Sequence, residues 1–240
     1  MLCSLSFRFA IIQSMRVKRL HSWRVSVAEA RAIQERLSGL VVRAGRPGYV
    51  KLVAGTDVSG ADESGMARAA IVVMGYPGMD VVEVSSVIDR VSFPYVPGLL
   101  SFREIPLLAR AFRKLSSQPD LVISDGQGYA HPRRFGLASH LGVLLGLPTI
   151  GCAKSRLCGV HGEIGTARGD WTELTDCGEV IGAVVRTRMN TRPVYVSSGN
   201  MIDLQSAIKW VLDCCQGFRI PEPTRLAHLA AGGRLVNLSN

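Results

Sequence analysis

The sequence lacks the features that mark several classes of protein. No apolar run reaches the roughly 18 to 20 residues that a helix needs to cross a bilayer, so we expect no membrane partner. The six cysteines include no Cys-x-x-Cys pair, which argues against a zinc site or a disulfide framework and favours reduced thiols in the cytoplasm. Internal repeats and low-complexity tracts are missing as well. The expectation is therefore an ordinary globular protein.

Acidic residues are scarce relative to basic ones. There are 19 Asp and Glu against 28 Lys and Arg, which gives a formal net charge of +9 and a pI near 9.6. Such an excess favours polyanionic partners, because each phosphate that Lys or Arg neutralises releases condensed counterions. Charge alone does not identify a nucleic-acid partner, since many basic proteins bind none.

The chain has 240 residues, of which 47% are hydrophobic, enough for one well-buried domain. We place this domain at residues 15–240 and expect a monomer. Residues 1–14 carry a single charge, and Met15 then opens a basic stretch that is typical of a natural start. We interpret residues 1–14 as a disordered extension or a misassigned start, with a weak targeting segment as the alternative.

The hydrophobic pattern predicts an α/β fold with a mixed sheet. Three strand-like runs joined by short turns predict an antiparallel meander, and a later strand–helix–strand pattern predicts two parallel strands. Residues 156–176 have no period and read as a long loop. The expected strands are 49–57, 69–74, 81–91, 121–124, 148–151, 180–186 and 193–197, and the expected helices are 26–42, 101–115, 134–145 and 203–215. Helices should therefore cover both faces of the sheet.

Three acidic residues lie where regular structure meets a loop: Asp57, Glu104 and Asp125. If the strands that precede Asp57 and Asp125 are adjacent and parallel, the two carboxylates share one edge of the sheet. Mg²⁺ prefers such oxygen ligands, and a divalent cation removes the repulsion between them. Ordinary turns and a Ser101-x-x-Glu104 capping box explain each residue separately, so both interpretations stay open.

Residues 94–98 read Pro-Tyr-Val-Pro-Gly. The two prolines fix two φ angles and remove two backbone donors, so Tyr95 should project from a stiff turn. A rigid aromatic residue close to an acidic one suits an enzyme that pushes into a stacked substrate. Simple Pro-Gly turn chemistry is the alternative.

A glycine-rich segment follows Asp125. Gly126 and Gly128 allow a close approach of the backbone to a ligand, and Arg133 adds fixed charge. His131 is a candidate base or ligand, and Lys154, directly after a strand, is placed to meet a phosphate. Ordinary loop and surface roles remain open for His131 and Lys154.

Together these segments resemble the endonuclease V family of deaminated-base nucleases, in family order over residues 24–229. The matching segments are Gly55-Thr56-Asp57-Val58, Pro94-Tyr95-Val96-Pro97-Gly98, Leu100-Ser101-Phe102-Arg103-Glu104, Asp125-Gly126-x-Gly128, His131-Pro132-Arg133-Arg134-x-Gly136-x-Ala138-Ser139-His140, Pro148-Thr149-Ile150-Gly151-x-Ala153-Lys154 and Gly217-Phe218-Arg219-Ile220-Pro221-Glu222-Pro223-Thr224-Arg225.

The resemblance implies a ribonuclease H-like fold and Mg²⁺-dependent cleavage, with Mn²⁺ as a substitute ion. The cut would fall at the second phosphodiester bond 3′ to hypoxanthine in DNA, with RNA as a second candidate, and would leave a 3′-hydroxyl and a 5′-phosphate. By motif, Asp57, Glu104 and Asp125 would bind metal and Lys154 would stabilise phosphate charge. Substrate binding would fall to the wedge at Pro94, Tyr95, Val96, Pro97 and Gly98 and to Gly126, Gly128, His131 and Arg133.

One departure concerns Asn200. The resemblance leads us to expect a histidine of the metal site after Gly199, where this chain has Asn200. Asparagine can offer a carbonyl oxygen to a metal but cannot act as a base. Asp203 is either a compensating ligand or a helix cap. We therefore expect slower cleavage.

Two alternative functions follow from the sequence. The first is a catalytically impaired protein that binds inosine-containing nucleic acid, because of Asn200. The second is a Rossmann-type nucleotide-binding enzyme built around Asp125-Gly-Gln-Gly. The missing third glycine and the preceding meander argue against the second.

Overall fold

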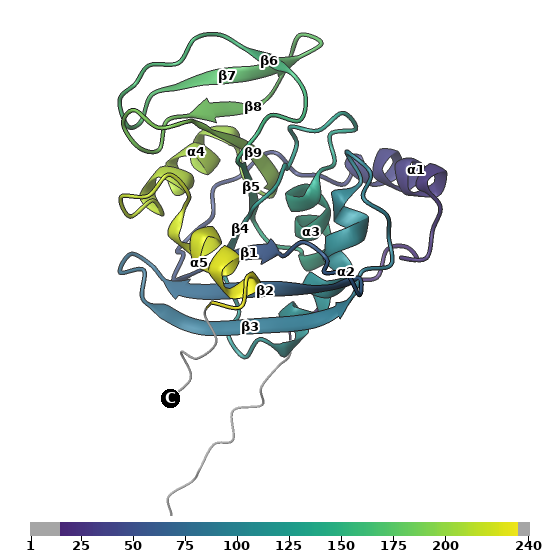
Figure 1. Ribbon diagram of the computed structural model, residues 1–240. Helices are drawn as coiled ribbons and strands as arrows, with labels where there is room; N and C mark the ends of the chain where they lie inside the picture. The colour runs from purple at the N-terminus through teal and green to yellow at the C-terminus, as the bar shows by residue number, and fades with distance from the viewer. Residues whose placement is uncertain (1–14, 235–240) are drawn as a thin grey trace, which may run out of the picture.

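The computed structural model describes residues 15–234, and the expectation for residues 1–14 lies outside the described residues. A nine-stranded sheet runs through the molecule in the order β3-β2-β1-β4-β5-β9-β8-β7-β6 (Figure 1). Its strands are β1 (Leu52–Val58), β2 (Met66–Gly75), β3 (Val81–Arg90), β4 (Leu121–Ser124), β5 (Thr149–Ala153), β6 (Val160–His161), β7 (Trp171–Asp176), β8 (Glu179–Val185) and β9 (Val194–Asn200).

The strand pairing confirms the mixed sheet. β1, β2 and β3 form the antiparallel meander, whereas β1, β4 and β5 are parallel neighbours. β9 then pairs antiparallel with β5 and begins an antiparallel extension through β8, β7 and β6. Only two strand pairs are parallel within the described residues, so the parallel sheet of a Rossmann domain is not observed.

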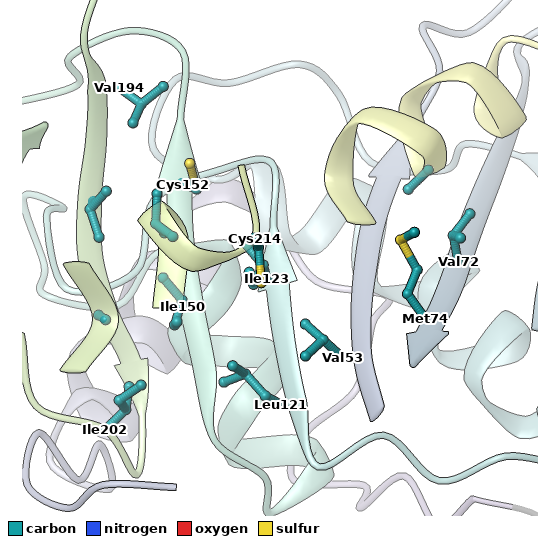
Figure 2. Packing of buried hydrophobic residues seen from close by; sticks show 14 of the residues in the cluster. Val53, Val72, Met74, Leu121, Ile123, Ile150, Cys152, Val194, Ile202 and Cys214 are labelled. Atoms are coloured by element: carbon teal, nitrogen blue, oxygen red, sulfur yellow. The ribbon is translucent and has the colours of Figure 1, made fainter. Parts of the chain in front are cut away.

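Helices cover both faces of the sheet (Figure 1). They are α1 (Val27–Ser38), α2 (Leu100–Lys114), α3 (Leu137–Leu145), α4 (Leu204–Asp213) and α5 (Glu222–Ala231). Side chains alternate across a strand, so Val53 packs with α4 and α5 and Ala54 packs with α2 and α3. Figure 2 shows the first of these cores, where Leu121, Ile123 and Ile150 are fully buried. Each such side chain contributes about 1.5–3 kcal/mol of transfer free energy.

Three local expectations are wrong. Part of the loop expected at 156–176 is ordered as β6 and β7, and the sequence reading omitted α5 altogether. The capping box is absent: the N-cap of α2 is Leu99, which makes no side-chain bond, and the Ser101 hydroxyl instead lies 3.1 Å from His140 Nδ1. Since α2 starts before Ser101, the hydroxyl faces the core rather than a free amide. No helix in the described part of the chain is long and apolar enough to span a bilayer.

Candidate active site

Asp57 and Asp125 meet at the carboxyl ends of two adjacent parallel strands. Thr56 of β1 and Ser124 of β4 are in register, and an aspartate directly follows each of them: Asp57 within β1 and Asp125 just after β4. Val53 of β1 packs against α4 and α5, so alternation places Asp57 on that same face. The same holds for Asp125, two residues beyond the buried Ile123. Strand register therefore brings the predicted pair together.

Helix α5 completes this cluster with His228. Its Nδ1 lies 2.7 Å from Asp57 Oδ2, and ligand atoms of His228, Asp57 and Asp125 all lie within 4.8 Å of one another. Gly55 explains how α5 comes so close, since a Cβ there would lie 2.0 Å from the Pro223 carbonyl carbon. The missing side chain lets the start of α5 rest directly on β1.

Glu104, on α2, lies close enough to the two aspartates for their charges to act on it, but it is not part of the group whose ligand atoms lie within 4.8 Å of one another. Burial raises the pKa of its carboxyl well above the usual range, and the charges of Asp57 and Asp125 raise it further. Burial also raises the pKa of Asp57, with Asp125 as the next cause, while His228 and Lys154 oppose the change. Two carboxyl groups with raised pKa values, Asp57 and Glu104, are the electrostatic condition that a divalent cation relieves.

The donor set fits a hard divalent cation. Carboxylate oxygens from Asp57, Asp125 and Glu104 suit Mg²⁺ or Mn²⁺, and an imidazole nitrogen is accepted more readily by Mn²⁺ than by Mg²⁺. His228 already contacts Asp57, so with Mg²⁺ it would serve to orient that carboxylate.

Lys154 joins the cluster from the end of β5. Its Nζ forms an ion pair with Asp125 Oδ2. Its backbone carbonyl accepts a hydrogen bond of 2.9 Å from Arg219 Nη2, and the next carbonyl, of Ser155, accepts one of 2.9 Å from Gln127 Nε2. Two side chains from distant segments thus fix the backbone that carries Lys154.

A pocket of about 330 Å³ opens beside the cluster. Tyr95, at the exposed turn, is 73% exposed. Six of the predicted substrate residues line the pocket: Tyr95, Val96, Pro97, Gly98, Gly126 and His131. Asp125 and Lys154 line it as well, whereas Asp57, Glu104 and His228 do not. Pro94, Gly128 and Arg133 do not line it. Gly128 is needed for packing, since a Cβ there would lie 2.3 Å from the Ser198 carbonyl oxygen of β9.

The structure contradicts the expectation for Asn200. It pairs with Thr149 at the start of β5, whereas Lys154 follows the other end of that strand. Its Oδ1 accepts a hydrogen bond of 3.1 Å from the Val42 amide, and its side chain is buried. The histidine that the structure places beside the two aspartates is His228. Asp203, the suggested compensating ligand, instead accepts a hydrogen bond from the Ser206 amide and caps α4.

The sequence reading missed His228 because it missed α5. Pro221 and Pro223 flank the first residue of this helix, and proline is favoured in a first helical turn. Ala227, Ala230 and Ala231 follow at helical spacing and are buried. These signals predict a helix, but they do not say which strand the helix covers.

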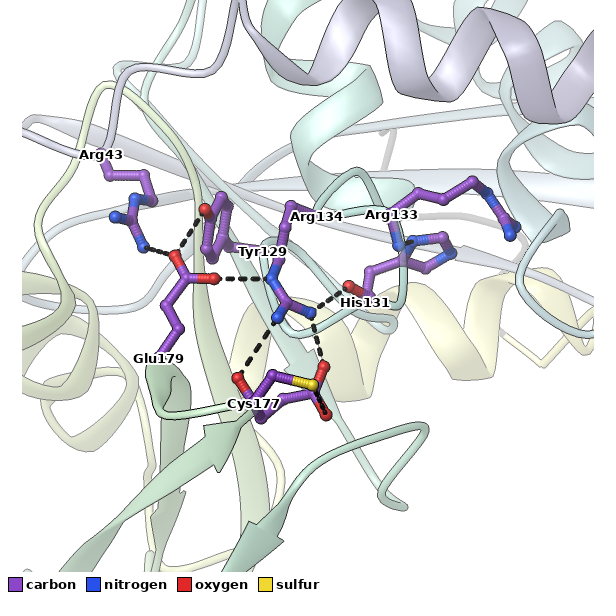
Figure 3. A network of polar contacts seen from close by, with 8 residues as sticks. Arg43, Tyr129, His131, Arg133, Arg134, Cys177 and Glu179 are labelled. Atoms are coloured by element: carbon purple, nitrogen blue, oxygen red, sulfur yellow. Dashed lines mark hydrogen bonds and ion pairs between the residues drawn. The ribbon is translucent and has the colours of Figure 1, made fainter.

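The two arginines of the glycine-rich segment extend in different directions (Figure 3). Arg134 forms ion pairs of 2.8 Å with Asp176 and with Glu179, on either side of the β7–β8 turn. Glu179 also accepts a hydrogen bond from the Tyr129 hydroxyl. The Arg134 charge is therefore neutralised within the protein, and its role is to attach the glycine-rich segment to the β7–β8 hairpin.

Comparison with known proteins gives a consistent result. The family model for Endonuclease V matches residues 35–229. Endonuclease V of Gloeobacter violaceus is 52% identical over 212 residues, which cover 87% of this chain and 86% of that protein. The crystal structure of Endonuclease V from Streptomyces avermitilis has a TM-score of 0.85 at 41% identity and covers 93% of this chain and 98% of its own.

A further solved structure contains a nucleic acid. Ciona intestinalis Endonuclease V, in complex with a DNA that contains an inosine followed by a ribo-adenosine, has a TM-score of 0.77 at 31% identity and covers 87% of this chain and 97% of its own. Family model, sequence relatives and solved structures agree over most of the chain. The chain belongs to the endonuclease V family and is a nuclease with a ribonuclease H-like fold.

Proposed function

We propose that this protein is a Mg²⁺-dependent endonuclease that cleaves the second phosphodiester bond 3′ to hypoxanthine in DNA and leaves a 3′-hydroxyl and a 5′-phosphate. The observation that carries the proposal is the cluster of Asp57, Asp125 and His228, with the charges of the two aspartates acting on Glu104, beside a pocket large enough for an extruded base. The relative from Ciona intestinalis was crystallised with inosine-containing DNA, which supports the substrate class.

Each residue of the site has a distinct part in this proposal. Asp57, Asp125 and Glu104 would hold the cation, which supplies charge neutralisation at the phosphate and activation of water. Lys154, next to Asp125, would neutralise the charge that develops on the phosphate oxygens. His228 would orient Asp57 through Nδ1, and its side chain is 62% exposed, which leaves the other edge of the ring open to solvent.

The pocket would receive the extruded base. Tyr95 would enter the space that the base leaves, and a mispaired base costs less to extrude than a paired one, which provides part of the selectivity. We keep the monomeric state, the cytoplasmic location and RNA as an additional substrate as predictions.

A cleavage assay with inosine at one position tests the proposal. DNA and RNA strands of the same sequence are incubated with Mg²⁺ or with EDTA, and mass spectrometry of the products identifies the cut bond and its ends. Wild-type protein should cut the inosine strand only with Mg²⁺, and Asp57→Ala should leave it intact. An active Asp57→Ala protein would show that the cluster is not the site. The non-catalytic alternative depended on Asn200, which pairs with Thr149 at the start of β5, away from Lys154 at the other end of that strand.

A further inference from the structure

The exposed turn at residues 94–98 ends in a glycine that cannot be replaced without strain. Gly98 has φ +78°, in the left-handed region that other residues rarely adopt. A Cβ there would lie 3.0 Å from Arg133 Nη2 and 3.5 Å from His131 Nε2. The left-handed conformation therefore favours glycine, and the space beside it is tight for a Cβ. Arg133 and His131, which border that space, also contact the Gly98 carbonyl group.

The Gly98 carbonyl oxygen accepts three hydrogen bonds. The donors are Gln34 Nε2 at 3.0 Å, His131 Nε2 at 2.9 Å and Arg133 Nη2 at 2.9 Å. His131 Nδ1 accepts a bond of 3.1 Å from the Arg133 amide, which leaves the ring proton on Nε2 to be donated to Gly98. An oxygen has two lone pairs, so three donors are more than are needed to satisfy the hydrogen-bonding capacity of this carbonyl group.

Gln34 connects the Gly98 carbonyl group to helix α1. It is 1% exposed, and every polar atom of its side chain is used. Its Nε2 also donates to the Phe135 carbonyl at 3.0 Å, and its Oε1 accepts from Arg133 Nε at 2.6 Å. The amide therefore joins α1, the end of the turn and the glycine-rich segment. Nothing in this arrangement touches Asp57 or Asp125 within the described residues.

We propose that Gln34, His131 and Arg133 are positioning residues that anchor the turn 94–98 while Tyr95 separates the strands of a duplex. This inference rests on the proposed function. The turn can displace a stacked nucleobase only if the segment that carries the turn stays in place. The two prolines stiffen only the turn itself. Gln34 and His131 also line the pocket, whereas Arg133 does not. All three serve the wedge through the Gly98 carbonyl oxygen.

The inference predicts a defect that depends on whether the substrate has a second strand. Single-turnover cleavage is measured on an inosine strand in duplex form and on the same strand alone. Gln34→Met keeps the side-chain length but removes both donors and the acceptor. It should slow cleavage of the duplex on the order of tenfold, because small displacements of positioned groups are costly. Cleavage of the single strand should change by less than about twofold, because no partner strand has to be displaced.

Leu37→Val is the matched control, because Leu37 is also buried on α1 but packs against Phe135 and Val143. A loss of stability without a wedge defect should lower cleavage of both substrates by the same factor. If Gln34→Met behaves like this control, or leaves duplex cleavage unchanged, the inference is overturned.

A second readout separates this inference from the proposed function. A 2-aminopurine next to the inosine brightens when its stack opens, and Ca²⁺ in place of Mg²⁺ allows binding to be followed without cleavage. Wild type should brighten the duplex probe and Gln34→Met should not. If wild type brightens the probe but cuts neither substrate, the inference stands and the proposed reaction fails. An equal signal from both proteins overturns the inference, and so does the absence of a signal from wild type.

Discussion

Removal of one carboxylate charge from the cluster should stabilise the protein in the absence of metal. Ligand oxygens of Asp57 and Asp125 lie within 4.8 Å. At an effective dielectric constant near 20, two unit charges at this separation repel by about 3 kcal/mol. Asp57→Asn removes that repulsion, and the amide oxygen can still accept the hydrogen bond from His228 Nδ1. Lys154 already offsets part of the repulsion through Asp125, so the net gain should be about 1–2 kcal/mol.

Thermal unfolding in EDTA at pH 7.5 measures this gain. For a chain of this length, 1 kcal/mol corresponds to about 2–4 °C in Tm, so Asp57→Asn should melt a few degrees above wild type. Added Mg²⁺ should make wild type the more stable of the two proteins, because a ligand stabilises the folded protein that binds it more tightly. Asp57→Asn should gain little from Mg²⁺ and should be inactive in cleavage.

The pH dependence of this effect has a defined sign. Burial and Asp125 raise the pKa of Asp57 in the folded protein, so folding is penalised as the pH rises from the ordinary carboxyl range through the folded pKa. The advantage of Asp57→Asn should therefore be complete at pH 7.5 and should shrink as the pH falls toward 4. A variant that melts below wild type in EDTA at pH 7.5 would refute the account of the cluster as a set of repelling charges.

Three further predictions concern single residues. His228→Ala should slow single-turnover cleavage on the order of a hundredfold, whereas Asn200→Ala should lower Tm without a change in the rate per folded molecule. Arg219→Ala should lower the cleavage rate and leave the DNA affinity in Ca²⁺ unchanged. Arg168→Ala removes an arginine that is bonded to a remote carbonyl, and it should leave both the rate and the affinity unchanged. Burial lowers the pKa of His131 to about 4, so its unfolded form binds the extra proton between pH 6.5 and 4. Urea titrations should show a loss of stability over this range of about 3 kcal/mol from this residue, and His131→Gln should flatten the profile.

The strand pattern predicted the part of the fold that holds the two aspartates. Short turns between apolar runs required the meander, and the strand–helix–strand unit required parallel pairing of β4 with β5. Asp57 and Asp125 end up together because both strands stop at one edge of the sheet. The sequence could not state that β1 and β4 are adjacent, since 62 residues separate Val58 from Leu121 and nothing local reports their pairing.

His228 shows what a linear reading loses. It lies 171 positions from Asp57, and the contact depends on α5 resting against the bare backbone of Gly55. The family resemblance placed the expected histidine after Gly199, so the prediction concerned Asn200 instead of His228. The partly buried hydrogen bond from the Val42 amide to Asn200 Oδ1 uses the same carbonyl chemistry that suggested a metal ligand.

The same ambiguity applies to His131 and Arg133. A glycine-rich loop with histidine and arginine is typical of a phosphate site, because these donors suit anions. A backbone carbonyl group also needs hydrogen-bond donors, and the carbonyl group of Gly98 accepts hydrogen bonds from both residues. Residue type therefore identifies the chemistry of the donor but not the identity of the acceptor. Only the tertiary contact with Gln34, almost a hundred positions away, decides that these donors serve the wedge.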